Sequence, residues 1–179
     1  MRAGARAVIL GLALAGAVGC SGPVKRPDGG VGLLPIGSRA PDLEGRDLEG
    51  NDVKLSDVRG KLAVVYFYPA DGTPGCTTEA CGFRDAWKRY KAADVVVFGV
   101  SSDSAEEHRK FQEKHKLPFP LVADTNGSVA TSYGVRKNLF GYERVTFLID
   151  REGRVARIWA EVDPGVHATE VLAEAKRVR

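Results

Sequence analysis

The sequence predicts an α/β domain built on a mixed β-sheet that helices cover on both faces. Two apolar runs, 62–68 and 95–100, are rich in β-branched and aromatic residues, which is typical of strands buried on both faces. Amphipathic segments between the apolar runs predict helices that connect parallel strands. A last pair of runs around a short turn predicts an antiparallel hairpin.

The predicted elements follow one another along the chain. Runs 43–48 and 52–55 flank turn residues and predict a small hairpin at the domain edge, ahead of strand 62–68. Apolar residues spaced by three and four predict a helix over 77–92, and Ser104 to Glu107 form a capping box that begins a second helix. The remaining expectations are a strand at 121–124, a brief helix at 128–133, a hairpin of 145–149 with 155–159, and a helix at 167–177. The thioredoxin-like α/β fold fits this order best.

Length and composition describe one ordinary globular domain. The chain has 179 residues, of which 44% are apolar and 27% charged. Its 26 Lys and Arg nearly balance its 23 Asp and Glu and form no basic run, so nothing supports a nucleic-acid partner. Three cysteines are too few for a disulfide-stapled scaffold, and each must be interpreted individually.

The first cysteine follows an export signal. The apolar run 7–18 comes after two arginines and has 12 residues, whereas about 20 are needed to span a bilayer, so we interpret 1–19 as a signal peptide. The stretch 17–20, Ala-Val-Gly-Cys, resembles the lipobox of bacterial lipoproteins, in which lipid is attached to the cysteine. Ala17 stands where leucine is usual, so plain secretion with a spare thiol at Cys20 stays open.

The segment that follows predicts a tether. Residues 20–33 include two prolines and four glycines and offer too little apolar surface to fold, so we expect a flexible link to a domain over 34–179. Loss of 1–19 removes two basic residues and leaves 24 against 23 acidic ones, so charge cannot hold the chain on a membrane. Lipid on Cys20 would be the membrane anchor, facing the periplasm or another extracytoplasmic side of the bacterial cell envelope.

The residues that can carry chemistry gather where strand 62–68 passes into the next helix. Cys76 falls in the first helical turn, where unpaired N–H groups and the helix dipole favour an anion, so a thiolate is expected. Pro69, Thr73 and Cys76 form the pattern Pro-x-x-x-Thr-x-x-Cys, and Cys81 follows five residues later.

This pattern resembles the active-site motif of the peroxiredoxins, and the cysteine spacing is similar to their bacterioferritin comigratory protein, or Q-type, subgroup. The resemblance extends over nearly all of 34–179, with further matches at 99–104, 117–119, 133–135 and 144–150. It implies a thiol peroxidase that reduces hydrogen peroxide and organic hydroperoxides and needs no metal or organic cofactor. It also implies a monomer that is recycled by a thioredoxin-like dithiol donor.

The resemblance assigns roles to single residues. Cys76 would attack the peroxide, and Cys81 would resolve the resulting sulfenic acid as a disulfide. Thr73 would hold the peroxide oxygen, and Arg144 would hold both thiolate and peroxide with its guanidinium. Glu79 matches the acidic residue of the cysteine helix, where an ion pair with an arginine and a surface charge both stay open.

Other interpretations remain. The Thr73 hydroxyl could make only a local loop bond, and Cys81 could be a small packing residue. A structural zinc site has little support because Cys20 lies on the expected tether and the histidines are scattered, at His108, His115 and His167. His108 and His115 are expected along an exposed helix.

Two other classes of function compete with the peroxidase. One is an exported thiol:disulfide oxidoreductase of thioredoxin-like fold, against which stands the absence of Cys-x-x-Cys. The other is an inactive surface lipoprotein that serves as a binding module, against which stands the presence of Thr73, Cys76 and Arg144 together.

A disulfide between Cys76 and Cys81 requires local unfolding. Five residues of α-helix rise about 7.5 Å, so the two Cα atoms would be roughly 8 to 9 Å apart, beyond the about 7 Å that a disulfide bridges without backbone movement. Gly82 lowers the helix propensity there by up to about 1 kcal/mol. We therefore expect the helix to open from about Thr77 to Phe83.

Overall fold

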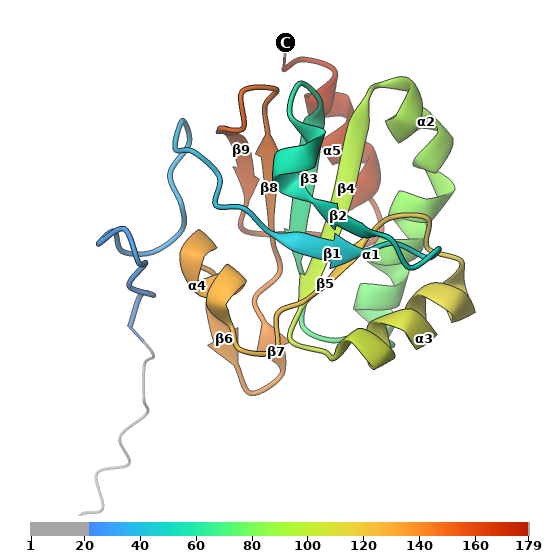
Figure 1. Cartoon of the computed structure of the whole chain (residues 1–179), viewed down its shortest axis with the longest axis horizontal. Coiled ribbons are helices and arrows are strands. Elements are labelled where there is room, and N and C mark those ends of the chain that lie inside the picture. The colour runs from blue at the N-terminus through green and yellow to red at the C-terminus, as the bar shows by residue number, and fades with distance from the viewer. Residues whose placement is uncertain (1–21, 179) are drawn as a thin grey trace, which may run out of the picture.

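Strand β3 (Leu62–Phe67) lies inside a seven-stranded mixed sheet with the order β2-β1-β5-β4-β3-β8-β9 (Figure 1). The computed structural model describes residues 22–178. β3 pairs in parallel with β4 and antiparallel with β8. The other strands of the sheet are β1 (Glu44–Arg46), β2 (Asp52–Lys54), β4 (Val95–Ser101), β5 (Leu121–Ala123), β8 (Val145–Ile149) and β9 (Val155–Trp159). The predicted mixed sheet is confirmed.

The two faces of β3 contribute to two separate hydrophobic cores. Leu62, Val64 and Tyr66 pack on one face with residues of the helices α1, α2, α3 and α5. Ala63, Val65 and Phe67 pack on the other with α4 and the segment before β1. The helices are α1 (Pro74–Asp85), α2 (Trp87–Ala92), α3 (Ala105–His115), α4 (Ser128–Tyr133) and α5 (His167–Ala175). The prediction of a sheet covered on both faces is therefore confirmed.

Both predicted hairpins are present. β1 pairs with β2 and also joins β5, and β8 pairs with β9 through a register shift between Leu148 and Ile149. A short 3-10 helix, η1 (Leu55–Val58), follows β2. A second, small sheet of β6 (Lys137–Asn138) and β7 (Gly141–Tyr142) was not predicted.

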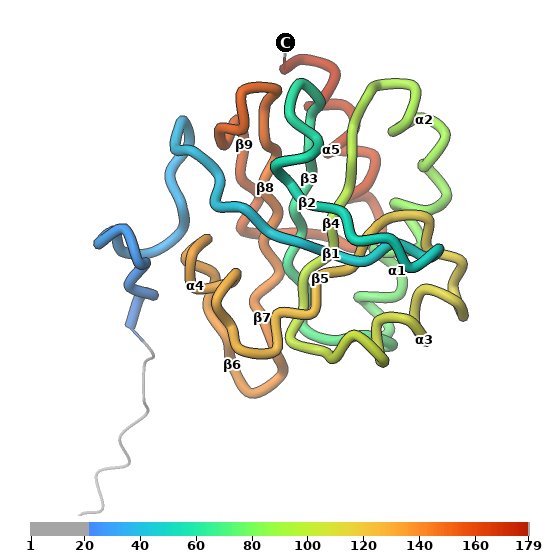
Figure 2. The backbone as a smooth tube through the Cα atoms, in the orientation of Figure 1, coloured from blue at the N-terminus to red at the C-terminus, as the bar shows by residue number. Residues whose placement is uncertain are grey.

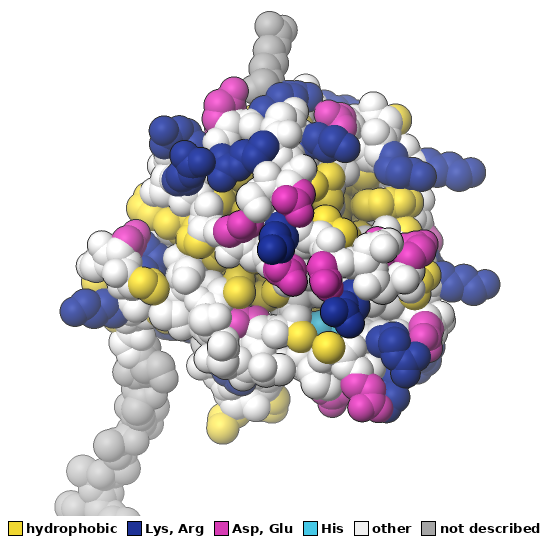
Figure 3. Space-filling view, viewed as in Figure 1, with side chains coloured by type: hydrophobic (Ala, Val, Ile, Leu, Met, Phe, Trp, Pro, Cys, Tyr) yellow, Lys and Arg dark blue, Asp and Glu magenta, His cyan; other side chains and the backbone are white. Residues whose placement is uncertain are grey.

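The surface is mixed in character. Leu139 and Phe140, at the tip of the β6–β7 hairpin, are 98% and 81% exposed. Figure 3 has the same view as Figure 1, and apolar side chains protrude at the lower end of the molecule, where Figure 1 shows this hairpin. On the face shown there, Lys and Arg alternate with Asp and Glu, with no large area of one sign.

The cysteine helix differs from its predicted bounds. It begins at Pro74, because proline fixes a helical φ and its missing N–H is not needed in the first turn. It ends at Asp85, where Ala86 takes φ −85° and ψ 0°, and α2 starts anew. The break lets α1 pack on α5 while α2 packs on β4. The single helix expected over 77–92 is thus two helices.

The segment expected to be a flexible tether has a defined conformation over 24–33. Lys25 and Val31 form an isolated antiparallel β-bridge. Arg26, which is 7% exposed, donates hydrogen bonds to the carbonyl oxygens of Gly32 and Leu33. These bonds compensate for the small apolar surface, and the segment runs beside α4 (Figure 2). The expected signal peptide and Cys20 lie outside the described residues. Within 22–178, no helix combines the length and apolar character needed to cross a bilayer.

Candidate active site

Cys76 is the third residue of α1, and its side chain is 1% exposed. Thr73 occupies the position before the helix, and its carbonyl accepts the N–H of Thr77 at 2.8 Å. The N–H groups of Gly75 and Cys76 precede this first helical bond, so they leave partial positive charge around the cysteine. The structure therefore places Cys76 at the positive end of a helix, as expected.

Arg144 reaches Cys76 from the residue just before β8. In the antiparallel register of β3 and β8, Phe67 faces Val145, so the start of β8 lies beside the end of β3. The Nη2 atom of Arg144 donates toward Cys76 Sγ at 3.4 Å. A guanidinium in this position stabilises negative charge on the sulfur.

Glu79 binds the other arm of the same guanidinium. Its carboxylate is fully buried, and Oε2 accepts from Arg144 Nη1. Burial raises the pKa of Glu79 to about 7, and the positive charge of Arg144 opposes that rise. Of the two possibilities left open for Glu79, the structure shows the ion pair. Since Cys76 and Glu79 are three residues apart on one helix, the planar fork contacts both.

His167, at the start of α5, lies behind Glu79. Its Nε2 is 2.8 Å from Thr146 Oγ1 and 3.9 Å from Glu79 Oε1, and the ring is fully buried. Burial lowers the pKa of His167 to about 4, and the nearby Arg144 adds to this effect. The ring is therefore neutral at pH 7, which leaves Arg144 as the cation that pairs with Glu79. The sequence predicts only scattered histidines and gives no sign of this contact of His167.

A hydrogen-bond network fixes the loop between β3 and α1. The Asp71 carboxylate accepts from the Tyr68 hydroxyl at 2.7 Å and faces His108 Nδ1 at 2.7 Å. The backbone N–H of Asp71 donates to Asp103 Oδ2 at 2.9 Å. His108 Nε2 faces the carbonyl oxygen of Val122 at 3.1 Å, so this nitrogen must carry a hydrogen.

The expectation that His108 lies on an exposed helix face is wrong, because its side chain is 3% exposed. His108, Phe111, Gln112 and His115 recur at helical spacing and form the inner face of α3. Potential ligand atoms of Asp71, Asp103 and His108 lie within 4.8 Å of one another. Both ring nitrogens of His108 already face protein oxygens, so a hydrogen-bond network accounts for the cluster.

The remaining motif residues lie on the same loop. The Thr73 hydroxyl donates to the carbonyl oxygen of Ala70 at 3.2 Å, which is the local loop bond given above as its alternative role. Pro69 touches Gly141 of β7, where φ is +115° and a Cβ atom would lie 2.0 Å from the Pro69 oxygen. Only glycine lets β7 approach this closely, and β7 leads directly to Arg144.

Cys81 lies in the third turn of α1 and is half-buried. Cys81 and Cys76 are both free cysteines, and they form no disulfide with each other in this structure. The Cys81 Sγ atom lies 3.9 Å from Nδ1 of His115, the last residue of α3. Since Cys76 and Cys81 belong to one uninterrupted helix, their sulfurs point to different sides.

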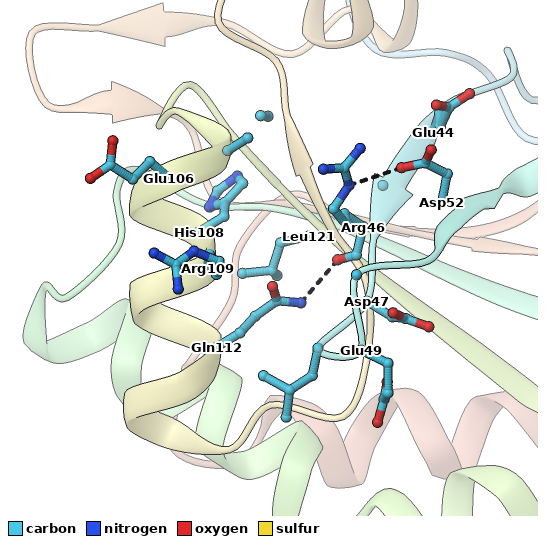
Figure 4. Close-up of a pocket in the computed structure, with 15 residues that line it drawn as sticks. Glu44, Arg46, Asp47, Glu49, Asp52, Glu106, His108, Arg109, Gln112 and Leu121 are labelled. Carbon is cyan, nitrogen blue, oxygen red and sulfur yellow. Dashed lines mark hydrogen bonds and ion pairs between the residues drawn. The ribbon is translucent and has the colours of Figure 1, made fainter.

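A cavity of about 550 Å³ lies between the β1–β2 hairpin and α3 (Figure 4). Arg46 binds Asp52 at 2.9 Å, and Gln112 Nε2 donates to the Arg46 carbonyl at 3.0 Å, as the dashed lines show. Neither cysteine lines this cavity, so it is separate from the reactive thiols.

Known proteins match the segment of the chain that contains Cys76, Cys81 and Arg144. The AhpC/TSA family model matches residues 36–158. Peroxiredoxin Bcp of Bacillus subtilis is 49% identical over 150 residues, which cover 80% of this chain and 96% of that protein. The putative peroxiredoxin bcp of Coxiella burnetii is 44% identical over 146 residues, which cover 78% and 97%.

Solved structures show the same similarity. The crystal structure of peroxidoxin BcpB from Mycobacterium tuberculosis matches with a TM-score of 0.73 and 34% identity, covering 82% of this chain and 99% of that one. Xanthomonas campestris peroxiredoxin Q matches with a TM-score of 0.70 and 34% identity, covering 75% and 90%. These matches confirm the predicted thioredoxin-like fold class.

Proposed function

Because the chain belongs to the AhpC/TSA family and is a thiol-dependent peroxidase of the peroxiredoxin type, we propose that it reduces hydrogen peroxide and organic hydroperoxides through Cys76. The observation that carries the proposal is the guanidinium of Arg144, which lies 3.4 Å from Cys76 Sγ and is ion-paired with buried Glu79. One rigid fork can stabilise the thiolate before attack and the peroxide oxygen during it.

The first step is proposed to be attack by the Cys76 thiolate on a peroxide oxygen. The O–O bond breaks, Cys76 becomes a sulfenic acid, and the leaving oxygen takes up a proton to form water or an alcohol. In this step the Thr73 hydroxyl turns from the Ala70 carbonyl to the peroxide. The exposed position of Thr73 on the loop supports this rotation, because the bond to Ala70 is local and replaceable.

The second step is proposed to be condensation of Cys81 with the sulfenic acid, which gives a disulfide and water. A thioredoxin-like dithiol then reduces the disulfide. Similarity to Bcp and Q-type peroxiredoxins supports the donor class. The monomer is proposed from the resemblance of the cysteine spacing to the Q-type subgroup. The competing oxidoreductase is not favoured, because the relatives are peroxiredoxins and no Cys-x-x-Cys is present in the sequence.

The step that involves Cys81 predicts a measurable opening of α1. One equivalent of peroxide is expected to lower the helical circular dichroism signal and to raise amide exchange between Cys76 and Cys81, since the intact helix holds the sulfurs apart. The Cys81→Ser variant should keep full helicity under the same treatment. Mass spectrometry should then find a Cys76 sulfenic acid that excess peroxide converts to sulfinic acid. Full protection in the oxidised wild type, or a disulfide between two chains, would contradict the proposal.

We further propose that the chain is exported and anchored in the bacterial cell envelope by lipid on Cys20. The support is the leader pattern of residues 1–19 and the lipobox-like residues 17–20. A cytoplasmic thioredoxin would not reach an exported enzyme, so the reductant would be a periplasmic or membrane-linked dithiol relay.

Cys20→Ala is expected to move the exported protein from the membrane fraction to the soluble fraction, because lipid on that thiol is the proposed attachment. Ser21→Ala is the matched control and should stay with the membrane. Intact mass spectrometry of the mature wild type should show Cys20 at its N-terminus with the added mass of lipid. A mature chain without lipid would remove the anchor and leave the peroxidase chemistry untouched.

A further inference from the structure

A ring nitrogen lies beside the Cys81 thiol. His115 Nδ1 is 3.9 Å from Cys81 Sγ, within the range of a hydrogen bond to sulfur, and the contact joins α1 to the end of α3. Neither peroxide attack by Cys76 nor the Arg144–Glu79 ion pair involves this histidine. The contact places a candidate proton acceptor on the sulfur that must lose a proton before it can act as a nucleophile.

Nearby contacts hold Cys81 against His115. Arg84 Nη1 donates to the backbone carbonyl of His115 at 2.8 Å. Phe83 is fully buried and packs edge-on against Phe119, with ring centroids 6.3 Å apart. These contacts fix the end of α1 and confine the opening expected over 77–83 to the residues before Cys81. Unwinding should therefore move Cys76 toward Cys81 while Cys81 stays beside the ring.

The surroundings of His115 favour its neutral form. Nδ1 accepts a proton when the ring hydrogen is on Nε2. The ring packs edge-on against Phe111 at 5.0 Å, and among the described residues Nε2 has no acceptor that would stabilise the added positive charge of an imidazolium. Burial, together with the positive charges of Lys114 and Arg84, lowers the pKa of His115 below its ordinary value. At pH 7 the ring is therefore neutral and able to accept a proton.

A surface hollow of about 250 Å³ gives solvent access to this histidine along α3. Its other ionisable lining residues are Asp71, Asp103, Glu107, Lys110 and Lys114. Because the hollow contains both signs of charge, it does not impose one strong field on the ring. Its size also admits a small molecule such as imidazole.

We propose that His115 is the general base of the resolving step, an inference that rests on the proposed role of Cys81. Nδ1 accepts the Cys81 thiol proton as the sulfur attacks Cys76, and an S–S bond forms while the S–O bond of the sulfenic acid breaks. The leaving oxygen carries away the electron pair and recovers the proton from His115 as water. The Cys81 sulfur is oxidised, the Cys76 sulfur is reduced, and the imidazole returns to its neutral form. Arg84, which is also close to Cys81, favours the thiolate as it forms.

This mechanism has a distinctive dependence on pH. An unassisted cysteine is only about 3% thiolate at pH 7, so its attack speeds up about tenfold per pH unit until the ordinary pKa of about 8.5. With a neutral base in place, the resolving rate instead stays nearly constant at every pH above the lowered pKa of His115.

The test is His115→Asn, which keeps a polar side chain beside Cys81 but cannot act as a base. After one equivalent of peroxide, intrinsic tryptophan fluorescence and acid-quenched mass spectrometry follow sulfenic acid formation at Cys76 and then disulfide formation. We expect an unchanged first step, a resolving step about tenfold slower at pH 7, and convergence with the wild type near pH 9. Glu113→Gln, at an exposed position of the same helix where Glu113 pairs with Arg109, is the control and should keep the flat profile. His115→Gln is the second variant if asparagine impairs folding.

Chemical rescue separates a base from a packing residue. In His115→Ala, added imidazole is expected to restore disulfide formation in proportion to its concentration at pH 7, because the adjacent hollow admits it. A flat, wild-type profile in His115→Asn, or no rescue of His115→Ala, would overturn the role of His115. Failure of the wild type itself to form a Cys76–Cys81 disulfide would instead overturn the role of Cys81.

Discussion

Cys76→Ser is expected to abolish peroxide turnover, with a loss of at least about 10³-fold, while the fold stays intact. A serine hydroxyl at neutral pH is a far weaker nucleophile than a thiolate, and neither the start of α1 nor Arg144 can compensate for that. The exchange removes little volume from a side chain that is 1% exposed, so the free energy of unfolding should change by about 1 kcal/mol or less.

The measurement is hydrogen peroxide consumption with a dithiol reductant in excess. Cys81→Ser is the matched control, because it changes the other thiol of the same helix and should still consume one equivalent in a single turnover. Turnover by Cys76→Ser near the wild-type rate would show that another group attacks the peroxide.

Arg144→Lys is expected to slow the oxidation of Cys76 by about 10²-fold. The guanidinium contacts Cys76 Sγ with one nitrogen and Glu79 Oε2 with the other. A single ammonium cannot reproduce both contacts. The weaker ion pair would stabilise the negative charge of the buried Glu79 carboxylate less. Since burial already raises the pKa of Glu79 to about 7, its neutral form should then prevail near pH 7.

The rate of Cys76 oxidation is measured by stopped flow with peroxide in excess, so that the reaction is pseudo-first-order. Arg136→Lys is the matched control, because Arg136 is more exposed and pairs with Glu143 at 2.8 Å, in the same part of the chain. That control should oxidise at the wild-type rate. Equal rates for wild type and Arg144→Lys would leave Arg144 with a structural role alone.

The strands and helices were predictable because their signals are local. The continuous apolar runs became β3 and β4, and the capping box at Ser104 formed as expected, with its hydroxyl accepting the Glu107 N–H at 3.3 Å. The break at Ala86 was not predictable from periodicity, because apolar spacing continues through it. The break arises because α1 packs on α5 whereas α2 packs on β4, and these packing partners are set by the tertiary structure.

In the site, too, the local arrangement was predictable from the sequence and the tertiary contacts were not. Cys76 and Glu79 are neighbours on one helix, whereas Arg144 is brought to them by the register of β3 and β8, which spacing alone does not reveal. The family resemblance supplied that contact. His167 binds Thr146 across elements and gave no sequence signal. The inner position of His115 on α3 did have one, since its spacing from His108 continues the buried face of that helix.

The anchored end of α1 has a consequence for the recovery of the enzyme after each turnover. Starting a helix is costly because several residues must be ordered for the first hydrogen bond, whereas extending one is easy. The end of α1 at Phe83 and Arg84 is anchored, and α2 beyond Ala86 is held by Tyr90, whose hydroxyl donates to the Ala168 carbonyl at 2.6 Å. Once a reductant cleaves the disulfide, the opened turns can grow back from this preserved template. The reduced enzyme should therefore rewind by elongation rather than nucleation, within microseconds of disulfide cleavage.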